Sequence, residues 1–444
     1  MRLGTQHLRL RVRSCAAVAV SLVLLLSSAW AAGKKVAPKP VDITKLVWPP
    51  PPDKPRVRYI SEYSGELDLI GKKQAKGGIL ERIAGVSVTP QERPRMIKPY
   101  GVAVDSKGRV YVTDTIKAVV FVFDLEHKTL EFRGNNAPAN LELPVGLAVD
   151  EKDRLFVSDS KTHQITCFAP DGTFESAFGA ADLKRPGGLA VDDSLHRLYV
   201  VDGGGKRIAV FDLDSLKLLR YMGQVKSGGD ITAGLDYPNS IAIDPDGLIY
   251  VTDAIMARVV VYDTEGNFVR AFGKRGDGAG MFGRPKGIAI DADGHVYVAD
   301  ALLNSMQIFS PEGRPLLNVG GNGMGPGQFM LMAGVAIDRK NRVIAVDQTP
   351  ARIEIFHYIT DEEAASGKTG ENVSEKPAAE SAAKVKAVAP APAPQPAASP
   401  AAPSGPTVEE LQQQLEELKA KLAAQQQQKP DEQKPAQEVP SSPK

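Results

Sequence analysis

Cysteine is nearly absent from this sequence, which has only two among its 444 residues. Cys15 lies close to the N-terminus and Cys167 stands alone in the remainder of the chain. Two cysteines are too few for a four-cysteine zinc site, and their wide separation in the chain excludes the C-x-x-C-H motif of covalent haem attachment. If the N-terminal segment with Cys15 is cleaved off, an internal disulfide is excluded as well. The net charge of +1 provides no overall positive field for nucleic acid or an anionic membrane. We therefore expect packing to supply the stability, and we expect no nucleic-acid partner.

Long hydrophobic runs are also missing, because no segment reaches the roughly 20 residues that a bilayer span requires. Residues 1–31 contain four arginines and no acidic residue, followed by an apolar stretch from Cys15 to Leu26 and the small-residue motif Ala29-Trp30-Ala31. This order is typical of a secretory signal peptide, and a retained signal anchor is the alternative. We expect an exported protein of a bacterial periplasm or cell envelope, or a secreted one, with no membrane span after cleavage.

Aromatic residues are absent from residues 359–444, where Ala, Pro, Gln, Lys and Glu dominate. Such a composition cannot bury enough apolar surface to fold, so we expect a disordered C-terminal tail. Its expected parts are an Ala/Pro-rich linker over 361–405, a short heptad helix over 406–428 and a disordered terminus over 429–444. The helix has a capping box at Thr407 and Glu410 and apolar residues at Val408, Leu411, Leu415, Leu418 and Leu422. It predicts weak oligomerisation or docking of a partner, with a lone fraying helix as the alternative.

The central part of the chain is a repeat. Six segments of the form GVAVD or close to it end at Asp105, Asp150, Asp192, Asp244, Asp291 and Asp338, at intervals of 45, 42, 52, 47 and 47 residues. A second aspartate follows nine or ten residues later and closes a β-branched or aromatic run, at Asp114, Asp159, Asp202, Asp253, Asp300 and Asp347. Nine residues after each of these comes an aromatic residue, at Phe123, Phe168, Phe211, Tyr262, Phe309 and Phe356.

Each copy predicts four short strands separated by turns, and a four-stranded unit of this length is one blade of a β-propeller. The sixth copy is one strand short, whereas residues 56–65 alternate as a strand and end in Tyr63-Ser64-Gly65. We therefore predict an all-β, six-bladed β-propeller over residues 55–360 that an N-terminal strand closes. A Pro-rich segment over 32–54 precedes it, and residues 66–98 form an insertion with a single helix near Ile79 to Ala84.

The motif P-x-G-[VIL]-A-[VI]-D, followed by V-x-D and I-x-[VI]-[FY], resembles the NHL repeat, and six copies resemble the six-bladed NHL propeller. The run Trp48-Pro49-Pro50-Pro51-Pro52 is similar to the start of exported bacterial members, which the resemblance associates with multihaem cytochrome systems. The namesake loop asparagine of the family occurs only at Asn304. Some relatives are lyases or lactonases that hold zinc or calcium over the central channel, so a metal-dependent enzyme of this type is the alternative function.

Six residues that follow the start of the inner strands are expected at the channel mouth: Tyr100, Val145, Gly187, Asn239, Lys286 and Ala333. They include neither a carboxylate nor a histidine, whereas catalytic zinc needs about three such ligands. The second aspartates could form a cation-binding ring, but we interpret them as acceptors of backbone N–H groups at the following loops. The sequence therefore predicts no metal site, no cofactor and no catalytic residues.

The loops after the second aspartates and the connections between blades are expected on one face. The Gly-rich segments 273–287 and 320–334 lack the strand, helix and Lys-Ser/Thr of a phosphate loop, so we interpret them as tight connections. Candidate binding residues on this face are Lys117, His163, Arg207, Arg258, Arg275, Lys286, Asn304 and Arg352. They predict a rim for a protein or peptide partner, with solvated loop charge as the alternative. We expect a non-catalytic binding or scaffold protein, since a ligand sensor would need a signalling domain that the chain does not encode.

Overall fold

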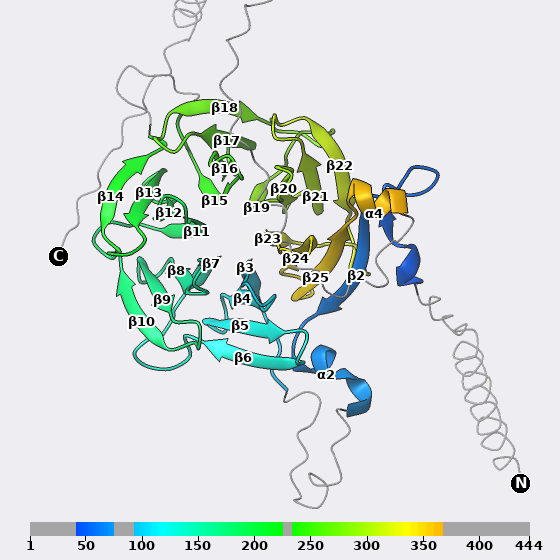
Figure 1. The fold of residues 1–444 in the computed structure, drawn as a ribbon, viewed down its shortest axis with the longest axis horizontal. Helices are drawn as coiled ribbons and strands as arrows, with labels where there is room; N and C mark the ends of the chain where they lie inside the picture. The colour runs from blue at the N-terminus through cyan, green and yellow to red at the C-terminus, as the bar shows by residue number, and fades with distance from the viewer. Residues whose placement is uncertain (1–40, 75–92, 225–232, 367–444) are drawn as a thin grey trace, which may run out of the picture. The chain divides into compact units, whose positions relative to one another are not determined.

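A computed structural model describes residues 41–74, 93–224 and 233–366 of this chain, and the helix predicted at 79–84 and the tail beyond residue 366 lie outside these ranges. Six antiparallel sheets are arranged in a ring around a central axis (Figure 1). This arrangement confirms the predicted six-bladed all-β propeller. None of the described helices is long and apolar enough to cross a membrane.

Five blades consist of four strands that follow one another along the chain. The first blade is β3 (Pro99–Val104), β4 (Val110–Asp114), β5 (Val119–Asp124) and β6 (Thr129–Arg133). The second is β7 (Pro144–Val149), β8 (Leu155–Asp159), β9 (Gln164–Phe168) and β10 (Phe174–Phe178). The third is β11 (Pro186–Asp192), β12 (Arg197–Asp202), β13 (Arg207–Asp212) and β14 (Leu218–Met222). The fourth is β15 (Pro238–Ile243), β16 (Ile249–Asp253), β17 (Arg258–Tyr262) and β18 (Phe268–Phe272). The fifth is β19 (Pro285–Ile290), β20 (Val296–Asp300), β21 (Ser305–Phe309) and β22 (Pro315–Gly320).

The sixth blade joins the two ends of the propeller domain. Its first three strands are β23 (Met332–Ile337), β24 (Arg342–Asp347) and β25 (Arg352–Tyr358), and its fourth is β2 (Val57–Tyr63). Tyr59 pairs with Phe356 and Tyr63 pairs with Ile353, which confirms the predicted closure of the ring by the N-terminal strand. A fifth strand, β1 (Val47–Trp48), adds to β2 and brings the Trp48 ring to 5.6 Å from the Phe356 ring.

Among the described residues, three short helical segments accompany the sheets: η1 (Ile43–Lys45), α2 (Glu66–Gln74) and α4 (Asp361–Ser366). The sequence analysis missed α2, which is interrupted at Gly71 with a φ of 75°. It also assigned residue 361 to a disordered linker, whereas α4 begins there. Thr360 caps α4: its hydroxyl accepts a hydrogen bond from the Glu363 amide at 3.2 Å, and the Glu363 carboxylate accepts one from the Thr360 amide at 3.0 Å.

The glycine of the GVAVD motif allows the inner strands to crowd around the axis. A Cβ at Gly101 would lie 2.2 Å from the Val145 carbonyl oxygen of the next blade, and a Cβ at Gly146 would lie 2.1 Å from the Gly187 oxygen. Gly334 meets the Tyr100 oxygen of the first blade in the same way, at 2.6 Å. Any larger side chain at these positions would push neighbouring blades apart, so the motif sets the width of the channel.

The core lies between successive blades. The repeated aromatic residues are almost completely buried, and Phe211, Phe309 and Phe356 have no exposed surface. Phe356 of the sixth blade packs in one cluster with Tyr297 of the fifth and with Phe329 of the connection between them. Each blade therefore covers its neighbour, which makes closure of the ring a requirement for stability.

Candidate functional site

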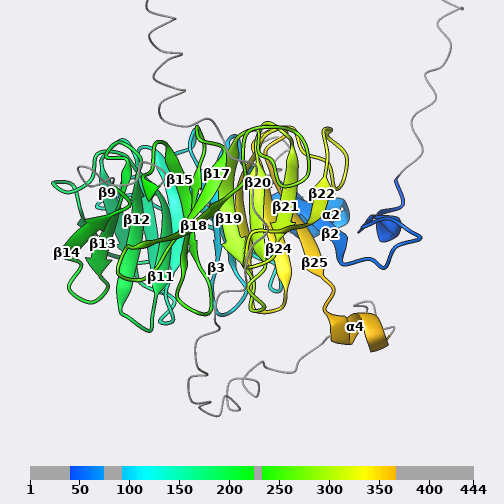
Figure 2. The same ribbon diagram turned by 90° about the horizontal axis from the view of Figure 1, so that it is seen from above.

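The two faces of the propeller are built from different connections. In the first blade Asp114 pairs with both Pro99 and Val119, so the loop after β4 and the start of β3 share one face, here called the loop face. The connections between blades also open on this face. The β3–β4 and β5–β6 turns lie on the opposite face, here called the turn face. In Figure 2, α4 continues from the end of β25 below the ring and thus marks the turn face.

The second aspartate of each repeat is a buried anchor of the loop face. Asp159 has no exposed surface and accepts four backbone N–H bonds. Two come from Glu142 and Leu143 in the connection from the preceding blade, and two come from Lys161 and Thr162 in the following loop. Asp114 and Asp300 accept the same four bonds. Asp202 and Asp347 also accept from both the connection and the following loop. Asp253 accepts backbone bonds from the connection alone. In every repeat except that of Asp253, the carboxylate therefore ties the loop to the incoming connection.

Most of the predicted basic residues of the loop face also have structural contacts. The Arg207 guanidinium contacts Asp202 at 2.9 Å, and Arg258 donates to the Gly234 carbonyl at 2.6 Å. Arg275, in the connection after β18, donates to the carbonyl of Ile255 in the β16–β17 loop at 2.5 Å. Asn304, with its amide nitrogen toward two carbonyl oxygens, donates to Ala301 at 3.2 Å and to Met330 at 2.8 Å. These four side chains shape the loops that display the rim.

Arg352 differs from the sequence interpretation, which placed it on an exposed rim. It is 2% exposed, and its guanidinium lies 2.5 Å from both Glu62 of β2 and Glu354 of β25. It also donates to the carbonyls of Gly325 and Gln328 in the connection to the sixth blade. Burial raises the pKa of Glu354 to about 8 in spite of the neighbouring Arg352. The charge of Arg352 therefore joins the closing strand to the ring and is not available to a partner.

Lys117 and His163 are exposed on the loop face, as the sequence predicts. Lys117 lines an open pocket of about 550 Å³ together with Arg93, Arg95 and Gln348. Arg93 contacts Glu66 of α2 at 3.3 Å. The sequence analysis did not select Arg93 or Arg95, because they lie in the insertion between β2 and β3, outside the repeat.

The channel mouth on the loop face brings together residues from different blades. Tyr100, Val145, Asn239 and Ala333 line a narrow channel of about 60 Å³, whose remaining walls are glycine, Ser240 and aliphatic residues of the inner strands. The Asn239 amide donates to the Tyr100 hydroxyl at 3.2 Å across the axis. Burial raises the pKa of Tyr100.

Lys286 lies beside Tyr100 at this mouth, and it is 7% exposed. Its ammonium lies 5.2 Å from the centre of the Tyr100 ring and donates to the Gln348 amide oxygen at 3.4 Å. No carboxylate of the described residues forms an ion pair with it. Burial, with Arg284 and Lys98 nearby, lowers the pKa of Lys286 to about 8. The sequence analysis placed Lys286 at the mouth, but its burial follows from contacts with two other blades.

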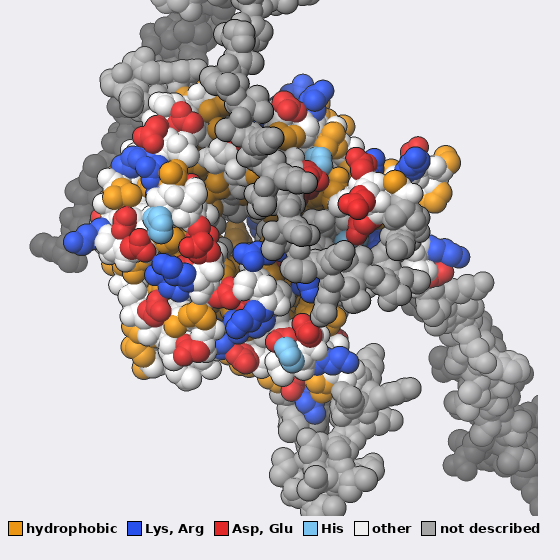
Figure 3. Space-filling model, in the orientation of Figure 1, with side chains coloured by type: hydrophobic (Ala, Val, Ile, Leu, Met, Phe, Trp, Pro, Cys, Tyr) orange, Lys and Arg blue, Asp and Glu red, His pale blue; other side chains and the backbone are white. Residues whose placement is uncertain are grey.

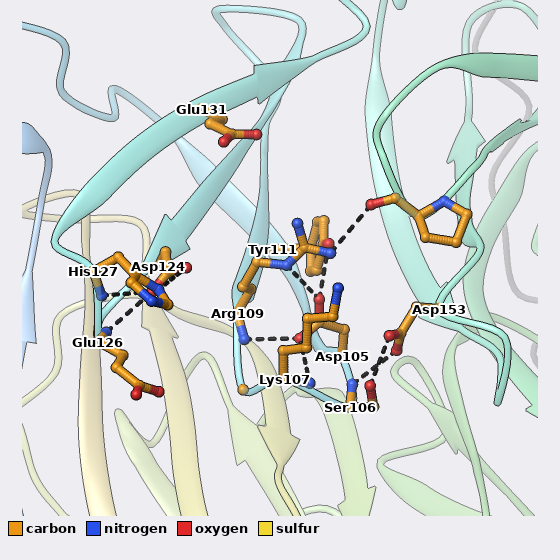
Figure 4. Close-up of polar contacts among 12 residues, drawn as sticks. Asp105, Ser106, Lys107, Arg109, Tyr111, Asp124, Glu126, His127, Glu131 and Asp153 are labelled. Carbon is orange, nitrogen blue, oxygen red and sulfur yellow. Dashed lines mark hydrogen bonds and ion pairs between the residues drawn. The ribbon is translucent and has the colours of Figure 1, made fainter.

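On the turn face, the first aspartates of the repeats organise the inner turns. Asp105 accepts hydrogen bonds from the Arg109 side chain at 2.6 Å and from the Tyr111 hydroxyl at 3.1 Å (Figure 4). Ser106 donates through its amide and hydroxyl to Asp153 of the next blade. Arg342 extends the pattern across the closure, because it donates to the Gly108 carbonyl of the first blade at 3.3 Å. This network joins neighbouring blades and occupies the carboxylates of Asp105 and Asp153.

One group on the turn face has metal-ligand residue types. Ligand atoms of Asp291, Asp293 and His295 lie within 4.8 Å of one another. However, His295 occupies the repeat position of Arg109, Arg154 and Arg342, and like them it contacts the repeat aspartate, at 3.0 Å. That contact raises the pKa of His295. The group is therefore the histidine version of a repeated structural ion pair, and it lies away from the loop-face mouth of the channel.

Charge on the turn face is mixed. Figure 3 shows acidic and basic side chains interspersed over the described part of this face. An open pocket of about 590 Å³ lies between the inner turns of the third, fourth and fifth blades and is lined by Asp192, Asp193, Asp244, Asp246 and Asp291 among others. Asp244 and Asp291 use their oxygens on turn amides and tyrosine hydroxyls, so they are occupied structurally.

Exposed apolar side chains distinguish the two faces more clearly than charge does. Eight of the large exposed apolar residues lie in loop-face segments: Ile97, Ile116, Leu143, Ile255, Met256, Leu302, Met324 and Met330. Leu195 is the only such residue in the inner turns of the described turn face. This set was not predicted from the sequence, although Ile116, Ile255 and Leu302 share the second position after the repeat aspartate.

Comparisons with known proteins agree with this architecture. Residues 141–168 match the NHL repeat, and residues 237–304 and 291–359 match the family described as 6-bladed beta-propeller. Curated proteins gave no match.

Among solved structures, similar folds include virginiamycin B lyase from Staphylococcus aureus, with 14% identity, a TM-score of 0.44, and coverage of 59% of this chain and 96% of that one. A gluconolactonase from Xanthomonas campestris has 19% identity, a TM-score of 0.46, and coverage of 59% and 86%. A protein of unknown function from Bacteroides thetaiotaomicron has 15% identity, a TM-score of 0.48, and coverage of 59% and 70%. Identities and TM-scores this low transfer no activity. The six sheets identify this chain as a six-bladed β-propeller, and the matched segments place an NHL repeat in its second blade.

Proposed function

We propose that this chain is an exported, non-catalytic binding or scaffold protein whose loop face receives a protein or peptide partner in a bacterial cell envelope. The observation that carries the proposal is the uneven distribution of exposed apolar side chains. Ile116 is 60% exposed and Leu302 is 66% exposed, both at the tips of loops that buried aspartates hold rigid. Apolar side chains gathered on one face of a rigid scaffold are typical of an interaction surface.

Lys286 supports a binding role over the metal-dependent lyase or lactonase. A divalent cation over the channel would lie beside a buried ammonium, and the two like charges would repel each other strongly in a poorly hydrated site. The remaining walls are Tyr100, Asn239, Ser240, glycine and aliphatic residues, and these include no carboxylate or histidine that could hold a catalytic metal. Basic residues around the mouth favour an acidic partner instead.

A pull-down from the envelope fraction tests the proposal. The full chain is immobilised beside a double variant, Ile116→Asp with Leu302→Asp, and a control, Leu195→Asp, which places the same charge on the turn face. We expect the full chain and the control to recover the same protein, and the double variant to lose it. A chain lacking residues 361–444 shows whether the tail contributes to capture.

Two outcomes contradict this proposal. If no protein is recovered by the full chain, or if the double variant recovers it as well as the control does, the loop face is not the binding surface. Metal analysis of the purified protein provides the second check, because one equivalent of tightly bound zinc or calcium would favour the enzyme.

A further inference from the structure

The channel mouth holds a buried cation that the fold leaves without a counter-charge. Every other strongly buried charge described on the loop face has an opposite charge or several backbone donors, as Arg352 and the repeat aspartates show. Lys286 has only the Gln348 amide oxygen at 3.4 Å and the face of the Tyr100 ring. An ammonium can donate three hydrogen bonds, so two of its donors are unused by the described residues.

A second donor lies beside it. Gln348 is 6% exposed, and its Nε2 has no hydrogen-bond partner among the described residues. The amide oxygen of Gln348 accepts from Lys286, and Gln348 is also one of the residues that line the pocket with Arg93, Arg95 and Lys117. Buried donors without acceptors are costly unless a ligand supplies the acceptor.

The surroundings select the sign and the size of that ligand. Lys98 and Arg284 are exposed near Lys286, and both act to lower its pKa, which places further positive charge at the mouth. Below the mouth the channel narrows to about 60 Å³ between inner strands that touch through their glycines. A ligand group therefore ends at Lys286 and does not pass through.

We propose that Lys286 and Gln348 form a binding site for one carboxylate, presented by an acidic side chain of a peptide segment that lies across the loop face. Two oxygens of a carboxylate can accept from the Lys286 ammonium and the Gln348 amide together. Tyr100 and Asn239 close the opposite side of the site. This site rests on the proposed function, and it specifies the chemistry of the segment that the loop face receives.

Titration calorimetry with the full chain tests the site at pH 7 and low salt. The probes are a short peptide with blocked ends and a single glutamate, its counterpart with glutamine, and free glutarate. We expect the glutamate peptide to bind at least tenfold more tightly than the glutamine peptide, since a charge-assisted hydrogen bond is lost in the latter. Lys286→Met should abolish this preference, and Gln348→Leu should reduce it severalfold. Lys340→Met, which removes an exposed lysine from the turn face, should retain it.

The pH dependence provides a second reading. Between pH 7 and pH 9 the preference of the full chain for the glutamate peptide should fall about tenfold as the Lys286 ammonium loses its proton. The Lys286→Met variant should show no such change.

The proposal is overturned if the full chain binds both peptides equally, or if Lys286→Met keeps the preference. Binding of glutarate without binding of the glutamate peptide assigns the site to a small free carboxylate and overturns the peptide as its ligand. The pull-down distinguishes the two proposals: a partner captured equally by the full chain and Lys286→Met contradicts this site alone. If the envelope fraction yields no partner, the binding role fails, whereas the carboxylate preference measured by calorimetry still stands.

Discussion

Replacing Lys286 with methionine should stabilise the propeller at neutral pH. Methionine keeps a flexible apolar stem of similar length and removes the buried ammonium. The pKa of Lys286 is lowered from 10.5 to about 8, mainly by burial, and a difference of this size corresponds to about 3 kcal/mol of free energy lost by burying the charged form. Loss of the contact with the Tyr100 ring offsets about 0.5–1 kcal/mol of the gain. We therefore expect the variant to be about 2 kcal/mol more stable at pH 7.

The sign of the pH dependence follows from the protons bound in each state. Below about pH 8 the lysine is charged in both the native and the unfolded chain, and the native state bears the full cost. Between about pH 8 and 10.5 the native state has lost the proton and the unfolded state retains it, so the wild-type free energy of unfolding rises with pH relative to that of the variant. By pH 10.5 the advantage of the variant should disappear.

Urea unfolding of the two proteins at pH 7, 9 and 10.5, followed by tryptophan and tyrosine fluorescence, measures this difference. Lys340→Met serves as the control and should show no pH-dependent change in the free energy of unfolding. A variant that is less stable than the wild type at pH 7, or a difference that does not change with pH, would refute the reasoning. It would mean that the Lys286 ammonium has a counter-charge in the native protein.

The other predictions concern anchors, turns and closure. Asp159→Ala leaves four backbone donors without an acceptor and should cost about 4 kcal/mol in urea unfolding, whereas Asp171→Ala in an exposed turn should cost little. His295→Asn should destabilise the protein at pH 5.5 and have little effect at pH 8.5. The contact with Asp291 raises the pKa of His295, and the stabilisation from this ion pair is lost as the pH rises through that pKa. Equal shifts of the melting temperature at both pH values would contradict this prediction. Deletion of residues 57–63 should expose the edge of β25 and cause aggregation, measured by light scattering, and a monomeric truncated chain with unchanged circular dichroism would contradict the role of β2 in closure.

The fold could be predicted from the sequence because the motif residues of a blade recur in six copies. The aspartate that ends β4, β8 or β20 and the aromatic residue nine positions later fix two strands and their register in every copy. The missing last strand of the sixth copy then implied a partner elsewhere, and the alternation of residues 56–65 supplied it. By contrast, β1 and α2 lie outside the repeat, in Pro-rich and mixed sequence, where neither periodicity nor repetition gives a signal.

The candidate site was harder to predict, because it depends on contacts between blades. Lys286 and Gln348 are 62 residues apart and belong to different blades, so no local pattern indicates that one is buried against the other. In the sequence, Arg352 resembles the other arginines of the loops. Cross-strand pairing places Arg352 beside Asp347, as it places Arg207 beside Asp202. The closing strand adds a contact between Arg352 and Glu62. Repeated positions therefore predict the backbone, whereas the role of an individual side chain depends on contacts with other blades and with β2.

The pairing of Tyr63 with Ile353 has a consequence for biogenesis. The ribosome must add nearly three hundred residues after β2 before β25 is available to pair with it. A partly synthesised chain therefore cannot form the closed ring. A chain that stops within that stretch leaves β2 without β25, and the exposed strand edge can pair with other chains. The architecture thus makes completeness of the polypeptide a condition for reaching the native state.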